Sequence, residues 1–221
     1  FSSWLPGAMV APTPISAYLH SATMVKAGVY LVARFAPPFA DVGFWRPVVL
    51  SVALITMITG GARALRQTDL KRLLAFGTVS QLGFLMVMFG AGRPEATLAG
   101  VVLIIAHALF KAPLFMVVGV IDHQSHSRDI RALGAWDPGS GGPRWVAIIS
   151  GLSMAGIPLL FGFIAKEAAY EAFSHHAGTG EWVVLAGIVA GSVLTFAYTG
   201  RFLLGAFTTR DVPGSSPLPA A

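Results

Sequence analysis

The chain has 221 residues, of which 55% are hydrophobic and 11% are charged. Because soluble domains carry roughly 25% charged residues, this composition predicts an integral membrane protein embedded in a lipid bilayer. Lysine and arginine (15 residues) outnumber aspartate and glutamate (10). They are not clustered with exposed aromatic side chains, so we expect no nucleic-acid partner. The absence of cysteine excludes disulfides, thiolate catalysis and cysteine-ligated metals.

Six apolar windows are long enough to cross about 30 Å of hydrocarbon. They lie at about Pro14–Phe35, Trp45–Ala62, Leu70–Gly90, Ala96–Ile121, Arg144–Phe173 and Trp182–Thr208. Proline pairs and glycine-rich stretches between the windows are typical of helix ends. We therefore predict an all-α, polytopic transmembrane bundle of about six membrane helices.

The charges of the loops predict the orientation of the bundle, because lysine and arginine are retained in cytoplasmic loops. The loops after the second, fourth and last helices hold most of these residues, whereas the opposite loops hold Arg34, Arg46 and Arg93. The first group comprises Arg63, Arg66, Lys71, Arg72, Arg128, Arg131, Arg144 and Arg210. The first helix is therefore predicted to run from the cytoplasm outward.

The two ends of the chain differ from the spans between them. The chain begins with Phe1, and residues 1–9 resemble part of a helix already under way, so we expect a fragment of a longer protein. Residues 212–221 are rich in proline, serine and alanine, a composition typical of a disordered tail. We assign residues 1–211 to a partial transmembrane domain.

The first span carries His20 and Lys26. A charged amine near the bilayer centre costs at least ~2.5 kcal/mol and is found facing a bundle interior, a partner or water. Lys26 lies near the middle of its window, which favours a functional role over snorkelling to the interface. The two residues are about 9 Å apart along a helix axis and on different faces, so water or neighbours would have to link them. His20 alternatively serves only as a hydrogen-bonding group within the bundle.

The fourth span contains His107 and Lys111, four residues apart and therefore on one helix face. Pro113 follows directly; its ring removes a backbone donor and clashes with the carbonyl of Leu109, which predicts a kink or break. Broken helices at membrane depth face protein or a water-filled cavity, the surroundings that proton transfer requires. A kink with incidental polar residues is the alternative.

The fifth span is interrupted by Gly156, Pro158 and Gly162 just before Lys166, which predicts a second discontinuous helix with a titratable amine deep in the span. A plain Lys–Glu pair at a helix end, formed by Lys166 with its neighbour, is the alternative. At the start of the third span, Lys71 is undecided between a buried and a solvated position. Its neighbour Arg72 is interpreted as a solvated cytoplasmic charge.

Other candidate sites are weaker. His123 and His126 are spaced like metal ligands but lack a third convergent ligand, and His175 and His176 lie in a loop. The glycine-rich run Gly139–Gly142 lacks the lysine of a phosphate-binding loop. No nucleophile with an adjacent base is visible. We therefore expect no metal, no cofactor and no enzymatic activity.

Several ordered stretches are similar to a known family. They are Trp4–Met9, Ala11–Pro14, His20–Met24, Asp69–Phe76, Ser80–Gly83, His107–Ala112 and Gly162–Glu167. These stretches resemble the antiporter-like membrane subunits shared by respiratory complex I and Mrp cation/proton antiporters. Within the family, Lys26 and Met116–His123 are most similar to the large A-type subunit of the Mrp sodium/proton antiporters.

The resemblance implies a fourteen-helix antiporter module, of which this chain would cover the end of the seventh helix to about the thirteenth. Lys26 would match the lysine that joins two half-channels, and His107 with Lys111 the central proton relay. Lys166 would match the terminal lysine on a broken helix, and His20 and Lys71 would be secondary members. A glutamate and its paired lysine, which the family carries on earlier helices, are not in this sequence.

The resemblance implies a proton-translocating subunit of a multisubunit sodium or other monovalent cation/proton antiporter in the cell membrane. Its partners would be other membrane subunits, protons and monovalent cations. The alternative is a proton-pumping membrane subunit of NADH:quinone oxidoreductase or of a membrane-bound hydrogenase, in which redox partners drive the protons. A third interpretation is a scaffold bundle without transport activity, which the lysines at membrane depth disfavour.

Overall fold

The computed structural model describes residues 7–21, 23–39, 41–133, 141–175 and 178–208, and these are almost entirely helical. The long helices are α4 (Trp45–Leu65), α5 (Leu70–Gly90), α6 (Pro94–Ser125) and α9 (Thr179–Phe207). The short helices are α2 (Thr13–Ser21), α3 (Ala27–Phe39), α7 (Gly142–Ala155) and α8 (Phe161–Ser174), with 3-10 turns η1 (Ala8–Val10) and η2 (Met24–Lys26). The expected all-α bundle is confirmed.

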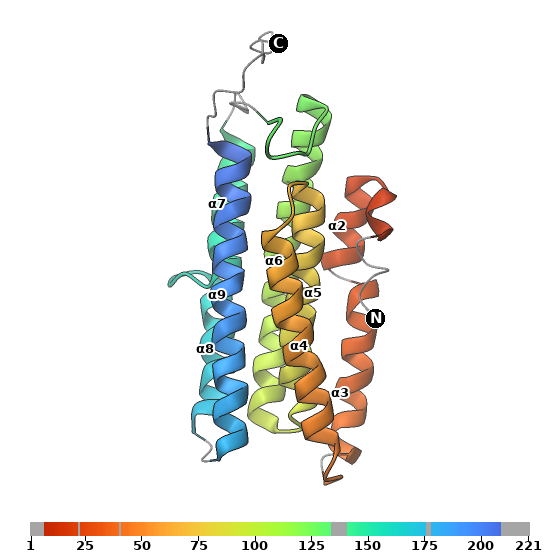
Figure 1. Cartoon of the computed structure of the whole chain (residues 1–221), viewed down its shortest axis with the longest axis vertical. Coiled ribbons are helices and arrows are strands. Elements are labelled where there is room, and N and C mark those ends of the chain that lie inside the picture. Colours follow the sequence, from red (N-terminus) through yellow and green to blue (C-terminus); the bar gives the residue numbers. More distant parts are fainter. Residues whose placement is uncertain (1–6, 22, 40, 134–140, 176–177, 209–221) are drawn as a thin grey trace.

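The bundle contains four continuous spans and two broken ones. Helices α4, α5, α6 and α9 are long and apolar enough to cross a membrane. The others form two end-to-end pairs, α2 with α3 and α7 with α8 (Figure 1). At 1.5 Å per residue, each of these short helices is only about 14–21 Å long, so each pair is needed to cross about 30 Å of hydrocarbon. The described part of the chain thus has four helices with the length and hydropathy of a membrane span, and two pairs of short helices at the positions of the first and fifth predicted spans.

The break between α7 and α8 follows from local backbone chemistry. Gly156 ends α7 in the left-handed region at φ 85°, a conformation that glycine adopts without penalty. Pro158 follows within the connecting turn, and Leu160 is extended before α8 begins. Gly162 lies so close to the Ser153 carbonyl that it leaves no room for a side chain. The break therefore falls where the sequence predicts it.

The break expected at Pro113 is not found, which corrects the prediction for the fourth span. Helix α6 continues from Pro94 to Ser125 with Pro113 inside it. A proline removes only one backbone donor, and α6 packs against α2, α5, α7 and α8, which hold the turns on either side in place.

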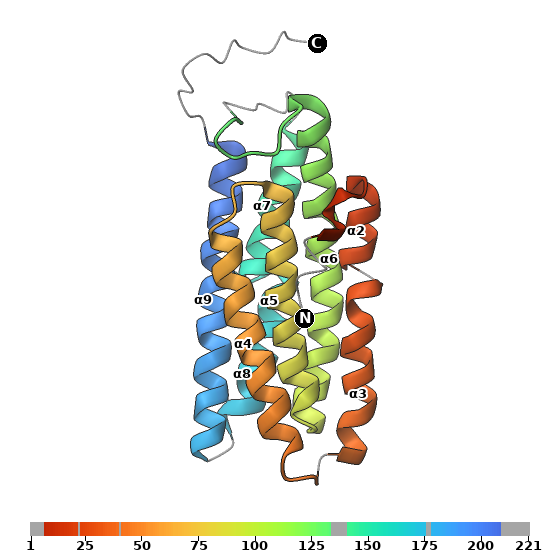
Figure 2. The same cartoon turned by 45° about the vertical axis from the view of Figure 1, so that its right-hand side comes forward.

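A break that the sequence reasoning missed lies in the first span. Thr23 leaves helical geometry (φ −117°, ψ −89°) and is followed by the 3-10 turn η2. Neither glycine nor proline marks this position. Serine and threonine hydroxyls compete for backbone hydrogen bonds, and this is the one local signal the sequence offers. As a result, α2 and α3 present separate surfaces to the rest of the bundle; Figure 2 shows α2 beside α6.

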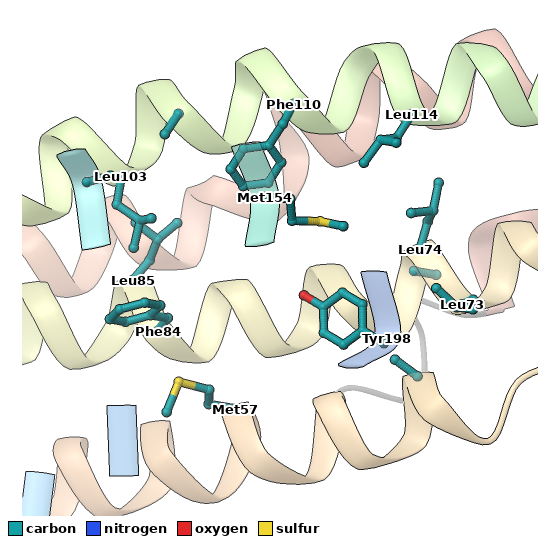
Figure 3. Packing of buried hydrophobic residues seen from close by; sticks show 14 of the residues in the cluster. Met57, Leu73, Leu74, Phe84, Leu85, Leu103, Phe110, Leu114, Met154 and Tyr198 are labelled. Carbon is teal, nitrogen blue, oxygen red and sulfur yellow. The ribbon is translucent and has the colours of Figure 1, made fainter. Parts of the chain in front are cut away.

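Helix α5 is the centre of the fold and is buried along most of its length. It contacts α3, α4, α6 and α9. Glycines permit the closest approach: a Cβ on Gly60 would lie 2.7 Å from the backbone nitrogen of Ser80, and one on Gly83 would lie 2.6 Å from that of Met57. Small residues at such crossings let membrane helices pack backbone to backbone. Figure 3 shows the apolar side chains that fill the remaining space between α4, α5, α6, α7 and α9.

Ion pairs tie the helices together at one end of the bundle. The Glu181 carboxylate accepts hydrogen bonds from Arg46 at 2.8 Å and from Arg93 at 2.9 Å. The Arg93 guanidinium also lies 4.9 Å from the centre of the Phe173 ring. Four elements, α4, α8, α9 and the start of α6, are thereby fixed to one another.

The opposite end holds the loop after α4 and the described residues of the loop after α6, on one side of the bundle as the charge pattern predicts (Figure 1). Asp69 caps α5 by accepting from the Arg72 backbone at 2.9 Å, and Arg128 lies 3.6 Å from its carboxylate. In the loop after α6, the hydrogen-bonded guanidinium of Arg131 holds the pKa of Asp129 below its usual range. Arg210 and the predicted tail at 212–221 lie outside the described residues.

Replacing Gly162 by alanine tests the packing of the fifth span. The new Cβ overlaps the Ser153 carbonyl, so α7 and α8 must separate, and we expect the free energy of unfolding to fall by about 1–3 kcal/mol. Thermal unfolding of the detergent-solubilised protein measures the change. Gly200→Ala is the matched control, because no heavy atom lies within 4 Å of its Cβ position. Equal midpoints for the two variants would contradict this packing.

Candidate functional site: buried lysines and histidines

All four lysines of the chain are buried: Lys26 is 9% exposed, Lys71 2%, Lys111 0% and Lys166 5%. By contrast, every described arginine is half-buried or exposed. Lysine therefore occupies the interior of the bundle, and the described arginines lie at or near its surface. Lysine changes its charge readily when it is buried, whereas arginine stays charged. The interior thus contains only cations that can gain and lose a proton.

The centre of the site is on α6, where His107 and Lys111 are both fully buried. Their i, i+4 spacing places them on one face. The Lys111 ammonium donates to the main-chain carbonyl of Leu74 on α5 at 3.1 Å. The His107 ring packs edge-on against Phe110 at 5.6 Å between centroids. The predicted pairing on one helix face is therefore present.

His20 reaches the same region from α2. Its ring lies 5.1 Å from that of Phe115 on α6, and it is close enough to Lys111 and His107 for electrostatic interaction. Its Nδ1 is buried and has no hydrogen-bond partner among the described residues. His107 approaches the backbone of Ser21, directly before the break in the first span. The break thus brings the end of α2 against the central histidine.

Lys26 is placed by the 3-10 turn after that break. The Lys26 amine donates to the carbonyl of Ile104 on α6 at 3.1 Å. Ile104 lies one turn before His107, and the Lys26 amine interacts electrostatically with the His107 ring. Sequence spacing indicated that His20 and Lys26 do not share a helix face. In the structure both reach α6, so the neighbouring helix brings them to one region.

Lys71 is buried at the start of α5, which resolves the alternative left open by the sequence, while Arg72 is exposed as expected. Its amine donates to the carbonyls of Met9 at 3.0 Å and Ala11 at 2.5 Å. The Lys71 amine also interacts electrostatically with the His20 ring. A cavity of about 470 Å³ adjoins it at the arginine-rich end of the bundle; its lining residues include Gly7, Met9, Val10, Asp69, Lys71, Arg72 and Arg128.

Lys166 occupies a separate pocket at the break between α7 and α8. Its amine donates to the carbonyl of Ala155, the last residue of α7, at 2.7 Å. A Cβ on Gly156 would lie 2.6 Å from Lys166 Cδ, so the glycine makes room for the lysine side chain. The broken helix both exposes the carbonyl and opens the pocket. The structure therefore gathers His20, Lys26, His107 and Lys111 around α6, and it holds both Lys71 and Lys166 at separate places.

Sequence reasoning missed a polar network between α5 and α9. Gln81 donates to Thr195 at 3.1 Å and to Tyr198 at 3.4 Å, and all three side chains are buried. Thr195, Tyr198 and Thr199 have i, i+3, i+4 spacing, which places them on one face of an apolar helix. That spacing is the signal that could have identified them.

The remaining histidines do not form a metal site in the part of the chain that the structure describes. No group of three or more histidine, aspartate or glutamate side chains converges there. His123, His126 and His175 are exposed, and His176 lies outside the described residues.

The fold and the buried amines define an α-helical, multi-pass membrane protein with protonatable side chains in its core. Comparison with known families agrees, because residues 1–195 match the family described as NADH:quinone oxidoreductase/Mrp antiporter, transmembrane. The chain belongs to this family.

Curated relatives include the A-type subunit of the Na(+)/H(+) antiporter of Bacillus subtilis, 44% identical over 94% of this chain and 28% of the relative. The A/B-type subunit of a probable K(+)/H(+) antiporter of Rhizobium meliloti is also 44% identical, over 96% of this chain and 22% of the relative. The chain thus spans about a quarter of the length of these relatives.

Two solved structures share the fold. The Mrp complex from Dietzia sp. DQ12-45-1b matches with a TM-score of 0.87 and 44% identity, over 94% of this chain and 23% of that one. The membrane-bound sulfane sulfur reductase, an archaeal respiratory membrane complex, matches with a TM-score of 0.84 and 26% identity, over 99% of this chain and 45% of that one.

Replacing Lys111 by methionine tests the energetic cost of the buried amine. The change roughly preserves volume and removes a polar group from the core, so we expect the free energy of unfolding to rise by about 1–3 kcal/mol. The thermal midpoint of the solubilised protein should increase. The exposed Arg66→Met is the matched control and should leave the midpoint unchanged. A lower midpoint for Lys111→Met would mean that the amine stabilises the fold.

Proposed function

We propose that the chain is part of a proton-translocating membrane subunit of a multisubunit monovalent cation/proton antiporter in the cell membrane. Protons pass along Lys26, His107, Lys111 and Lys166, with His20 and Lys71 as additional members. One observation carries the proposal: every lysine of the chain is buried, and Lys26 and Lys111 are grouped with His20 and His107 around α6.

The hydrogen bonds of the amines support proton transfer. Each described lysine amine donates to a main-chain carbonyl, and no carboxylate pairs with it among the described residues. A neutral amine and a protonated ammonium can both donate to a carbonyl, so gaining or losing a proton leaves the hydrogen bond in place. A nearby carboxylate would instead favour the charged form. The amines of Lys26, Lys111 and Lys166 are therefore free to alternate between the two states, whereas Asp69 and Asp122 act electrostatically on Lys71.

Coupling between neighbours links the protonation state of one group to those of the others. Two positive charges in a medium of low polarity repel more strongly than in water. A proton arriving at Lys26 or at Lys111 therefore disfavours protonation of His107, and the groups titrate as a coupled set. Cation binding at another point of the complex that changes the charge of one member would shift the protons of the others. This is how electrostatic repulsion would couple cation and proton movement.

The relatives support an antiporter, since they are named as antiporter subunits for Na(+) or for K(+). We propose that the exchanged ion is one of these monovalent cations and that the chain works with other membrane subunits within the lipid bilayer. The chain itself acts as a transporter part, not as an enzyme.

A second candidate function is a proton-pumping subunit of a redox complex. The match to the archaeal sulfane sulfur reductase complex and the family description favour it. In that case, electron transfer in partner subunits would drive the same protonatable groups. Neighbouring genes distinguish the two: small Mrp-type membrane subunits indicate the antiporter, and hydrophilic redox subunits indicate the pump.

Lys111→Ala tests the proposed function in membrane vesicles that hold the assembled complex. General acid–base groups contribute about 100-fold or more to proton-transfer rates, so we expect cation-dependent proton flux to fall at least ~100-fold. A pH-sensitive dye reports the flux, normalised to the amount of complex. Arg66→Ala removes an exposed charge and should leave the flux unchanged. Unchanged flux in Lys111→Ala would exclude Lys111 from the proton path.

A further inference from the structure

The Lys111 amine lies in a small enclosure built by two other helices. On one side it donates to the carbonyl of Leu74 on α5. On another side lie Gly77, whose Cβ position is 3.2 Å from Lys111 Nζ, and the ring of Tyr198 on α9, whose centre is 6.0 Å from it. A side chain at position 77 would press against both the amine and the ring, at 3.0 Å from Tyr198 Cε2. Gly77 thus lets Tyr198 approach the lysine.

Tyr198 is itself held in place by buried polar groups. It is 0% exposed, and its hydroxyl donates to the carbonyl of Gly77 at 3.5 Å and accepts from Gln81 at 3.4 Å. Gln81 also donates to Thr195, which in turn donates to the carbonyl of Gly191. Both contacts of the hydroxyl are long, so the ring position depends on the two together.

This network is a poor way to stabilise a membrane bundle. The Gln81 Oε1 atom is buried and has no hydrogen-bond partner among the described residues. A buried polar atom without a partner carries a desolvation penalty, and an apolar side chain at the same place would avoid it. Packing alone therefore does not explain a glutamine, a threonine and a tyrosine beside Lys111.

We propose that Tyr198 is a positioning residue for proton transfer at Lys111, with Gln81 fixing the phenol. The ring limits the space open to the amine and presents its electron-rich face to the positive charge, which favours the protonated form. The proposal rests on the proposed function. It assigns to α9 a part in the site that the buried lysines alone do not indicate.

The surroundings of Lys111 leave few other groups to act in this way. His107 on its own helix and His20 on α2 are the titratable neighbours that interact with it electrostatically. Helix α5 contributes the Leu74 carbonyl, which accepts the hydrogen bond of Lys111. Lys71, also on α5, interacts electrostatically with His20. Helix α7 packs with Met154 next to Phe110 and Leu114 (Figure 3), and Lys166 on α8 bonds to Ala155. Tyr198 is the neighbour contributed by α9.

Tyr198→Leu in the assembled complex tests the proposal. We expect cation-dependent proton flux per complex to fall about tenfold, because the amine is no longer held in position. We also expect the pH of half-maximal flux to shift by about half a unit toward acid, because the ring no longer favours the ammonium. Tyr198→Phe keeps the ring but loses both hydroxyl contacts, so its flux and pH profile should lie between those of the wild type and of Tyr198→Leu. Phe202→Leu is the matched control, since it removes another fully buried aromatic ring from α9, one turn away.

Two results would overturn the proposal: pH profiles that coincide for Tyr198→Leu and Phe202→Leu, or Tyr198→Phe as impaired as Tyr198→Leu. If Tyr198→Leu does not assemble, Gln81→Leu is tested instead, because it removes the hydrogen bond to the Tyr198 hydroxyl and leaves no large cavity. An unchanged pH profile of Gln81→Leu would also overturn the proposal. Absence of cation-dependent flux in the wild-type complex overturns the proposed function as well. Loss of flux in Lys111→Ala with normal behaviour of Tyr198→Leu overturns only the role of Tyr198.

Discussion

The need to give each buried amine a hydrogen-bond acceptor in hydrocarbon governs the structure. Hydrocarbon offers no hydrogen-bond partner, and an unsatisfied polar group there costs several kcal/mol. The acceptors are main-chain carbonyls. Two of them, Ile104 and Leu74, lie within continuous helices, where a carbonyl has a second lone pair to offer. For Lys166 the acceptor is Ala155, whose carbonyl is freed because α7 ends there. The broken fifth span is thus a means of accommodating a lysine.

The choice between lysine and arginine follows from the same constraint. Arginine is always charged and forms ion pairs with carboxylates, and it occurs here at the ends of the bundle, as in the pairs of Glu181 with Arg46 and Arg93. These pairs connect helices and stay fixed. Lysine bound to a neutral carbonyl keeps its hydrogen bond in either protonation state. The ends of the bundle therefore hold permanent charges that fix the helices, and the interior holds charges that can change.

Much of this arrangement can be predicted from the sequence, because charged or titratable side chains within apolar windows are rare and easily recognised. The number of spans, the break before Lys166 and the shared face of His107 and Lys111 follow from composition and spacing. Pro113 misled the prediction, because one missing donor does not break a helix that four neighbours support. The break after Ser21 has only neighbouring serine and threonine hydroxyls as a local signal, and the spacing of Thr195, Tyr198 and Thr199 does not reveal that Tyr198 contacts Lys111, because both features depend on tertiary packing.

Helix α6 remains continuous while spans on both sides of it are broken, and this difference matters for how the site can move. His107 and Lys111 are fixed relative to each other by one intact helix. Lys26 instead sits in the interrupted first span and bonds across to α6, and Lys166 bonds across the gap between two half-helices. Displacing a half-helix alters the hydrogen bond of Lys26 or Lys166 and leaves the spacing on α6 unchanged. Lys26 and Lys166 therefore lie at helix breaks, while His107 and Lys111 between them lie on one continuous helix.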